Sequence, residues 1–306
     1  MKPTITVFTP TFNRAYTLFR CYESLKRQTS RDFIWLIIDD GSTDDTKELV
    51  GRWIAEGIIP IRYHYQDNQG MHGAHNTAYR LIETELNVCI DSDDFMTDDA
   101  VEKIVLFWQQ NGADRYAGII ALNADKGGNV IGTKLPRNKT EITLTGFYSS
   151  GGRGDKKLIY RTAVMRKYPP YPVFAGEKYV SLSYKYILAD QEYTMLIMNE
   201  AVCIVEYRAD GSSLNMIDQY RKNPRGFAEF RKLSMQHSVN RLYIFRQCIH
   251  YVSSSIMLRN AKFIRESPCR IMTILAIPFG LLLYLYIAKI AGKWTAVQAG
   301  RKGAIS

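Results

Sequence analysis

The sequence predicts an α/β fold in which a doubly wound, mostly parallel sheet is followed by a basic helical region. Three observations lead to this fold class. Short apolar runs typical of buried strands alternate with helical patterns through the first 125 residues. Polar clusters follow three of these runs, as at a ligand-binding sheet edge. Residues 211–306 carry 15 basic and 3 acidic side chains, which leaves 25 basic and 27 acidic ones in residues 1–210.

The elements of the first part can be placed in order. Residues 5–9 form a strand, which Pro10 is expected to end because proline lacks a backbone donor. The next helix carries Leu18, Tyr22 and Leu25 on one face. Another helix begins after Ser42-Thr43 and buries Leu49, Trp53 and Ile54; further strands are predicted at 33–38, 61–65, 88–90 and 119–122, and further helices at 73–82 and 98–108.

The pattern changes after residue 125. Loops rich in glycine, lysine and asparagine extend to residue 154, and a proline-rich segment covers 168–172. The sequence therefore predicts a domain at 1–215, with halves at 1–125 and 126–215, and a helical tail at 216–306. Within these parts, helices are predicted at 181–192, 227–238 and 242–263, and a strand at 201–207.

Composition narrows the class of protein. Hydrophobic residues make up 46% and charged residues 23% of the chain, which argues against disorder, collagen and a multi-span membrane protein. The five cysteines are scattered without a CxxC pair, so a disulfide framework or a thiolate zinc site is not expected. The apolar run at the N-terminus is also too short for a signal peptide. The cysteines and this N-terminus together predict a reducing, cytoplasmic location.

Three polar clusters at predicted strand ends could carry chemistry. They cover 9–14, 39–44 and 91–94, and their convergence is a stronger signal than any one of them. Neither GxGxxG nor GxxxxGK[ST] occurs, so a dinucleotide site or a P-loop has no support. No pairing of cysteine and histidine indicates nucleophilic catalysis.

The cluster at 91–94 contains three carboxylates, Asp91, Asp93 and Asp94. Like charges this close raise one another's pKa, and a cation is the natural compensation. Hard oxygen ligands favour Mg²⁺ or Mn²⁺ bound together with substrate phosphates. A helix-capping acidic turn is the alternative reading.

Each of the other polar segments can likewise be interpreted as a ligand contact or as a purely structural feature. A carboxylate at Asp39-Asp40 could accept the imide N–H of a uracil or thymine base, or could form an Asx-turn. Arg14 could pair with a phosphate or with Asp40. The glycine-flanked segment 69–76 could contact a nucleotide or sugar through its N–H groups and histidines, or could be a tight turn.

Taken together, these motifs resemble glycosyltransferase family 2, which has the GT-A fold. The resemblance covers residues 1 to about 125, and later segments resemble a bacterial surface-polysaccharide branch of the family. The motifs are Thr-Pro-Thr-Phe-Asn-Arg at 9–14, Ile-Asp-Asp-Gly-Ser-Thr-Asp at 38–44, Gly-Met-His-Gly-Ala-His-Asn at 70–76 and Asp-Ser-Asp-Asp at 91–94, with the segments 154–161, 174–179 and 206–211 in the later part.

The resemblance implies roles for individual residues. Residues 1–125 would bind the nucleotide-sugar and 126–215 the acceptor, with Asp93 ligating a Mn²⁺ or Mg²⁺ that bridges the diphosphate. The catalytic base would be Glu177 in Gly176-Glu177-Lys178, where lysine replaces the family's second acid, and Asp190 is the fallback, although its helical position suggests a solvated face. The expected donor-binding residues are Thr9, Asn13, Arg14, Asp39, Asp40, His72, Asn76, Asp91 and Ser92.

The tail adds an expectation about the membrane. Residues 271–288 contain no charge, which is near the lower limit for a membrane span, and Pro278 in their middle allows a kink or a re-entrant hairpin. Arginine and lysine flank the segment on both sides, as in an interfacial element. We therefore expect the tail to associate with the membrane, with self-association through the apolar segment as the alternative.

The resulting functional prediction is an inverting, metal-dependent glycosyltransferase at the cytoplasmic membrane face. It would move a sugar from a nucleoside-diphosphate donor, UDP-linked by preference, to a lipid-linked or growing surface saccharide. One alternative is a sugar nucleotidyltransferase, which shares nucleotide-binding features. The other is a basic, non-enzymatic protein that binds nucleic acid or membrane, but no nucleic-acid reader motif is present and the basic residues adjoin an apolar segment.

Overall fold

The computed structural model describes residues 3–206 and 216–302, so most of the motif at 206–211 lies outside the described residues. The chain divides into two compact units. The first consists of the described residues of Met1–Tyr171 and Lys185–Tyr207, and the second of Pro172–Tyr184 and the described residues of Arg208–Ser306.

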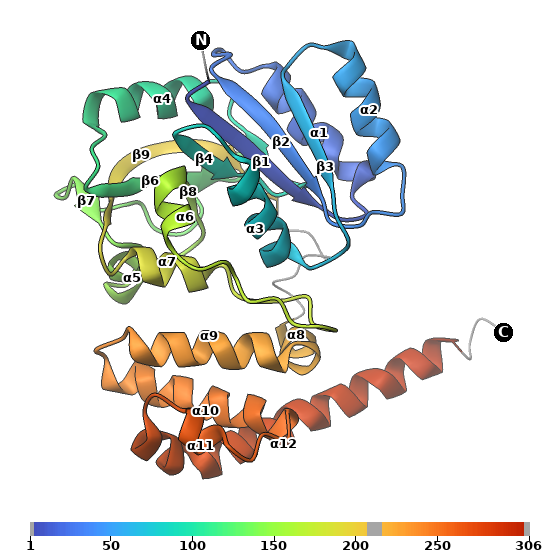
Figure 1. Cartoon of the computed structure of the whole chain (residues 1–306), viewed down its shortest axis with the longest axis vertical. Coiled ribbons are helices and arrows are strands. Elements are labelled where there is room, and N and C mark those ends of the chain that lie inside the picture. Colours follow the sequence, from blue (N-terminus) through green and yellow to red (C-terminus); the bar gives the residue numbers. More distant parts are fainter. Residues whose placement is uncertain (1–2, 207–215, 303–306) are drawn as a thin grey trace. The chain divides into compact units, whose positions relative to one another are not determined.

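The first unit contains a mixed, mostly parallel sheet with the strand order β3-β2-β1-β4-β8-β6-β9-β5, and β7 pairs with β9 (Figure 1). β1 runs parallel to both β2 and β4, which confirms the doubly wound arrangement expected for the first part. Antiparallel β8 separates β4 from β6. The strands are β1 (Ile5–Thr11), β2 (Phe33–Asp39), β3 (Ile61–Tyr65), β4 (Leu86–Cys89), β5 (Phe95–Met96), β6 (Tyr116–Ala124), β7 (Glu141–Ile142), β8 (Lys156–Arg161) and β9 (Thr194–Ile204).

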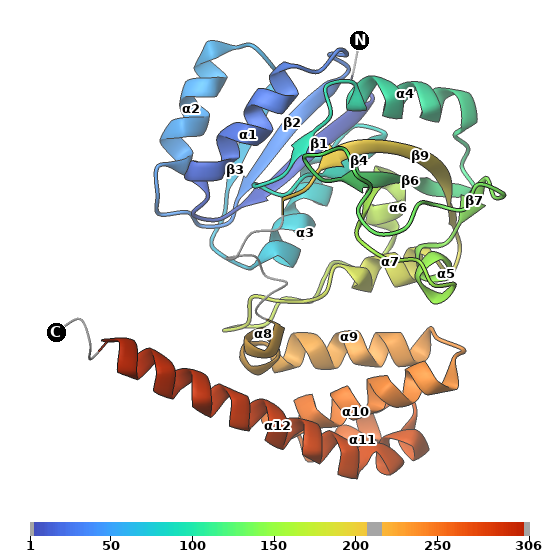
Figure 2. The same ribbon diagram turned by 180° about the vertical axis from the view of Figure 1, so that it is seen from behind.

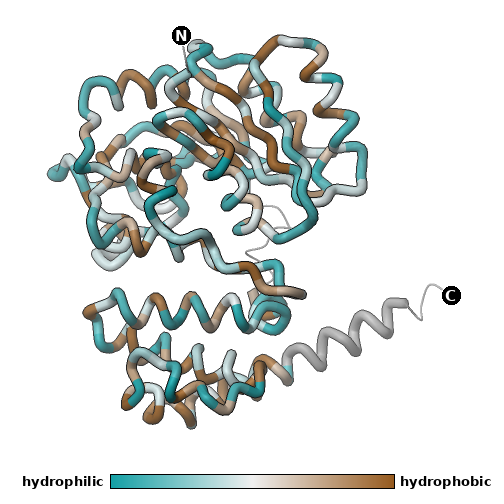
Figure 3. Tube along the Cα trace, viewed as in Figure 1, coloured by the Kyte–Doolittle hydropathy of each residue, from teal (hydrophilic) through white to brown (hydrophobic). Residues whose placement is uncertain are grey.

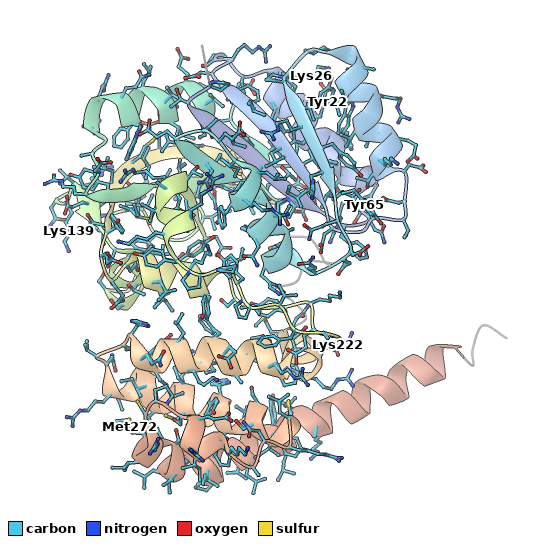
Figure 4. All side chains as sticks on the ribbon, in the orientation of Figure 1. Tyr22, Lys26, Tyr65, Lys139, Lys222 and Met272 are labelled. Carbon is cyan, nitrogen blue, oxygen red and sulfur yellow. The ribbon has the colours of Figure 1, made fainter. Side chains whose placement is uncertain are left out.

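Helices cover both faces of this sheet (Figure 2). One face packs against α1, α2 and α4, and the other against α3. On the first face Tyr22, Trp35 and Trp53 form a stack, and Lys26 Nζ lies 5.0 Å from the centroid of the Tyr22 ring (Figure 4). The helices are α1 (Ala15–Lys26), α2 (Thr46–Glu56), α3 (Met71–Leu81), α4 (Ala100–Asn111), α5 (Leu144–Ser149), α6 (Thr162–Lys167) and α7 (Ser183–Ala189).

Pro10 does not end the first strand, contrary to the expectation from its missing donor. β1 continues to Thr11, and Pro10 pairs in register with Ile38 of β2. The carbonyl of Phe8 accepts from the backbone N–H that follows β4, whereas the carbonyl of Thr11 accepts from the backbone N–H of Asp40, which follows β2. Pro10 therefore faces the β4 side beyond the last β1–β4 pair, where no ladder donor is required.

The second predicted helix also differs in detail. α2 begins at Thr46, and Asp45 rather than the expected Ser42-Thr43 stands at its N-cap. Trp53 is buried as expected, but Ile54 is 46% exposed. The residues between the end of β2 and the start of α2 form a loop instead.

The second unit is helical. α9, α10 and α12 pack through a small apolar core that includes Met235, Cys248, Tyr251 and Ala276. α12 continues through Pro278 as one helix, so the chain does not turn back there in a hairpin, and brown apolar positions recur along its first half in Figure 3. The helices are α8 (Met216–Lys222), α9 (Pro224–Gln236), α10 (Arg241–Met257), α11 (Phe263–Glu266) and α12 (Arg270–Lys302).

Candidate active site

The carboxyl ends of β1, β2 and β4 lie side by side at one edge of the sheet. Thr11 of β1 pairs with Asp39 of β2, and Phe8 of β1 pairs with Cys89 of β4. The polar segments that follow these strands are therefore neighbours. An open parallel sheet binds its ligands at such an edge.

Asp39 lies at the end of β2 and is 1% exposed. Its carboxylate accepts from Ser42 N at 2.7 Å and from the hydroxyl of Tyr63 at 2.6 Å. Burial and this carboxylate raise the pKa of Tyr63, so the phenol keeps its proton and remains a donor. Asp39 thus ties the loop after β2 to β3.

Asp40 anchors the loop that opens α3. Its Oδ1 accepts from Gln66 Nε2 at 2.7 Å and from Gln69 N at 2.9 Å, while its Oδ2 accepts from Gly70 N at 2.7 Å. Gly70 has a φ of 82°, which glycine adopts without strain. The carboxylate of Asp40, which was expected to bind a nucleotide base, therefore holds the neighbouring loop in place.

Replacing Asp40 with alanine is expected to lower the free energy of unfolding by ~3 kcal/mol, because one buried and two part-buried donors lose their acceptor. Asp67→Ala removes an exposed carboxylate from the same loop and serves as the control. Urea unfolding followed by circular dichroism measures both variants. Equal stabilities of the two variants would show that Asp40 is not the anchor.

The loop that leaves β1 is joined to the loop that leaves β2. Asn13 has a φ of 52°, and its Oδ1 accepts from Thr43 N at 2.7 Å. Ser42 Oγ in turn accepts from Asn13 N at 2.9 Å. Arg14 Nη1 donates to the hydroxyl of Tyr16 at 2.7 Å. Asn13, which was expected to contact the donor, therefore holds the two loops together in the structure, whereas this bond of Arg14 stays within its own segment.

Thr9 is fully buried, and its Oγ1 accepts from Trp35 Nε1 at 3.0 Å. By contrast, Thr11 Oγ1 and Gln66 Oε1 are buried beside the same strand ends and have no hydrogen-bond partner among the described residues. Buried polar atoms are normally paired. Thr11 and Gln66 thus each keep an unpaired polar atom beside the strand ends, whereas the hydroxyl of Thr9 is already paired.

The segment predicted as a glycine-flanked loop forms the start of α3. His72 and His75 are both buried, and burial lowers the pKa of His75 to about 4, so His75 is neutral. Asn76 binds the backbone of Tyr171 through both amide atoms, at 2.9 Å and 2.8 Å. Asn76 therefore holds the proline-rich segment against α3.

The residues Asp91–Asp94, which we call the acidic turn, follow β4 after a single residue, Ile90. Asp94 N donates to Asp91 O at 3.0 Å, and Cys21 Sγ of α1 donates to Asp94 O at 2.9 Å. Asp91 is exposed, Asp93 is half-buried, and Asp94 and Ser92 are buried. The turn therefore presents Asp91 and Asp93 outward while Asp94 lies beneath them.

A buried lysine lies close to the acidic turn. Lys157 of β8 donates from Nζ to Cys89 O at 3.2 Å. Burial lowers the pKa of Lys157, but the nearby thiol of Cys203 and the carboxylates of Asp94 and Asp91 raise it by more, so the net shift is upward. Burial raises the pKa of Asp94 to about 7, with further raising by Asp91 and Asp93 and lowering by Lys157. Sequence reasoning missed Lys157 as a site residue, although Lys156-Lys157 lies in one of the motifs that support the resemblance.

The described residues contain no group of three histidine, cysteine, aspartate or glutamate side chains that could hold a metal by itself. Mg²⁺ and Mn²⁺ commonly use one or two protein carboxylates together with phosphate oxygens. The outward carboxylates Asp91 and Asp93 fit that donor set. The pKa of Asp94 is raised first by burial and then by the negative charge of Asp91 and Asp93, a charge that a bound cation would offset.

The two candidates for the base are both hydrogen-bonded. Glu177 is 7% exposed in the second unit, and its carboxylate accepts from Arg225 N at 3.0 Å and Gly226 N at 2.9 Å at the start of α9. Asp190 accepts from Leu144 N at 3.1 Å and Thr145 N at 2.6 Å at the start of α5. Asp190 follows the end of α7, and burial raises its pKa, so it does not lie on a solvated helical face.

Comparisons with known proteins address the family. The protein-family model described as "Glycosyl transferase family 2" matches residues 6–168. The chain is 34% identical over 129 residues to Chondroitin synthase of Escherichia coli, covering 42% of this chain and 19% of that protein. It is 32% identical over 98 residues to the Teichoic acid poly(glycerol phosphate) polymerase of Staphylococcus epidermidis, covering 32% of this chain and 14% of that protein. The chain thus spans a minor part of these relatives.

Solved structures agree on the fold. S. aureus TarS in complex with UDP-GlcNAc aligns with a TM-score of 0.58 and 18% identity, covering 89% of this chain and 79% of that chain. The mannosyltransferase PcManGT from Pyrobaculum calidifontis, in complex with GDP-Man and Mn²⁺, aligns with a TM-score of 0.55 and 17% identity, covering 99% and 80%. These likenesses establish the GT-A-like architecture.

Proposed function

The chain belongs to glycosyltransferase family 2, and we propose that it moves a sugar from a nucleoside-diphosphate donor, preferably a UDP-sugar, to a saccharide acceptor. The observation that carries this proposal is the acidic turn, which follows β4 beside the loops that leave β1 and β2. Structural neighbours bind UDP-GlcNAc and GDP-Man, which supports a nucleotide-sugar as the substrate class.

Residues of the sheet edge would bind the nucleotide end of the donor. The unpaired oxygens of Thr11 and Gln66 are suited to accept from its base or ribose, while Asp39 and Asp40 hold the surrounding loops. Asp93, with Asp91, would hold a Mn²⁺ or Mg²⁺ against the diphosphate. The bound ion would neutralise the charge that develops on the leaving diphosphate.

The transfer itself is a single displacement. The acceptor hydroxyl oxygen forms the new bond to the anomeric carbon, the bond from that carbon to the diphosphate oxygen breaks, and the diphosphate leaves with its electron pair. The hydroxyl proton passes to a carboxylate base. The family resemblance of Gly176-Glu177-Lys178 supports Glu177 in this role, with Asp190 as the second choice.

We place the enzyme in surface-polysaccharide synthesis at the cytoplasmic face of the membrane, with a lipid-linked or growing saccharide as acceptor. The names of the relatives support a role in surface-polysaccharide synthesis, since they include a chondroitin synthase and a teichoic acid polymerase. The apolar, basic tail supports association with the membrane.

A panel of UDP-, GDP- and TDP-sugars, each tested with Mn²⁺, would identify the donor by thermal shift. A ligand present at one hundred times its Kd stabilises the folded chain by ~2.7 kcal/mol. We expect one nucleotide class to raise the melting temperature, with slow release of the nucleoside diphosphate. Release of pyrophosphate from a nucleoside triphosphate and a sugar phosphate would instead identify a nucleotidyltransferase, and the absence of any shift would contradict the proposal.

A further inference from the structure

α12 exposes a continuous row of large apolar side chains, which we call the apolar stripe. It includes Ile271 at 78% exposure, Leu275 at 61% and Leu282 at 64%. Because its members recur at intervals of three and four residues, they lie on one face of the helix. The stripe consists of Ile271, Ile274, Leu275, Phe279, Leu282, Leu285 and Tyr286.

The opposite face of α12 is occupied by protein. Thr273, Ala276 and Gly280 are buried against α10 and its surroundings. A Cβ at Gly280 would meet Val252 Cβ at 2.5 Å, which shows how closely the two helices approach. Over residues 270–289, for which burial is described, one face of α12 is therefore covered by α10 and the other is exposed.

The length and composition of Arg270–Lys289 would also suit a helix that crosses a membrane. The packing argues against a crossing. α10 carries exposed Arg246, and its Gln247 accepts from buried Arg231 of α9 at 2.7 Å. A crossing would have to break the contact between α12 and α10 or take these polar groups into hydrocarbon, at ~3 kcal/mol for a single arginine.

The charges near the stripe suit an anionic lipid surface. Arg259, Lys262, Arg265 and Arg270 are exposed in the segment before the stripe, where Glu266 is the one acidic residue. Lys289 follows it, seven residues after Leu282 and thus on the same face. Each basic residue contributes about 1 kcal/mol near an anionic membrane surface.

We propose that α12 lies in the plane of the membrane interface, with the apolar stripe inserted among the lipids and α10 on the side away from them. The inference rests on the membrane association proposed above and defines its geometry: the chain enters one leaflet and does not cross. Lipid is favoured over a second protein copy because the stripe is flanked by cations at both ends.

Flotation of the full chain with sealed vesicles tests the surface. Leu275→Asp combined with Leu282→Asp should reduce binding to vesicles of phosphatidylcholine and phosphatidylglycerol in equal amounts by at least tenfold. The control Leu106→Asp changes a leucine of α4 that is 48% exposed and should bind like the wild type. Vesicles of phosphatidylcholine alone should bind the wild type more weakly.

A C-terminal epitope tag tests the geometry. When the tagged chain is added to preformed sealed vesicles, added protease should remove the tag completely, because an interfacial helix leaves both chain ends outside. Protection of the tag would show a crossing and overturn the inference while leaving membrane association intact. Failure of the wild type to float would overturn both, as would a dimer that the double aspartate variant converts to a monomer without any change in vesicle binding. None of these readouts depends on sugar transfer.

Discussion

Replacing Asp93 with alanine is expected to reduce metal-dependent sugar transfer by ~100-fold or more, since a metal ion typically supplies several kcal/mol of transition-state stabilisation. The fold should remain intact, because Asp93 is a half-buried residue at the surface of the acidic turn. Transfer or slow donor hydrolysis with added Mn²⁺ measures the effect, and a chelator should inhibit the wild type to a similar extent.

Asp98→Ala is a matched control for this variant. Asp98 is an exposed carboxylate close in sequence, and its Oδ1 pairs with Arg27 Nε at 3.0 Å outside the acidic turn. Its loss should leave transfer within about twofold, since exposed ion pairs contribute little. Wild-type activity in the Asp93 variant, or a wild type that ignores the chelator, would refute the metal role.

Glu177→Gln should lower turnover by ~10²–10⁴-fold with little change in donor binding, because the amide cannot take up a proton. The change also has a structural cost. The carboxylate accepts from Arg225 N and Gly226 N, and an amide offers a single acceptor oxygen to these two donors. We expect a loss of stability of about 1 kcal/mol, which unfolding would measure in parallel with turnover.

Asn223→Ala separates the two effects. Asn223 Oδ1 accepts from Lys178 N at 2.7 Å, so its removal disturbs the same segment without touching the carboxylate. Turnover should fall much less in this variant than in Glu177→Gln. An equal loss in both would make Glu177 a structural residue. A larger loss in Asp190→Asn than in Glu177→Gln would assign the base to Asp190.

The first half of the fold could be predicted because its signals are local. The apolar runs that became β1, β2 and β3 are followed by helices whose buried positions recur at helical spacing. The antiparallel insertion of β8 was not predicted. Its first two residues are lysines, which indicate a surface segment, yet both are buried in the structure because their ammonium groups donate to backbone carbonyls.

The candidate site was predicted as a location rather than as a set of contacts. The position of the acidic turn follows from the sequence, because strand ends converge at one edge of a parallel sheet. The partners of Asp39 and Asp40 come from β3 and the following loop, and no local pattern indicates such long-range pairs. The capping of α9 by Glu177 likewise depends on a contact between residues far apart in sequence.

Calorimetric titration of UDP into the full chain, with and without Mn²⁺, tests the central claim most directly. We expect tight binding that requires Mn²⁺ in the wild type and in Asp98→Ala, and binding that is weak and insensitive to Mn²⁺ in Asp93→Ala. Equal affinity of the wild type in the presence of Mn²⁺ and of a chelator, or unchanged Mn²⁺-dependent binding in Asp93→Ala, would contradict a metal-assisted donor site at the acidic turn.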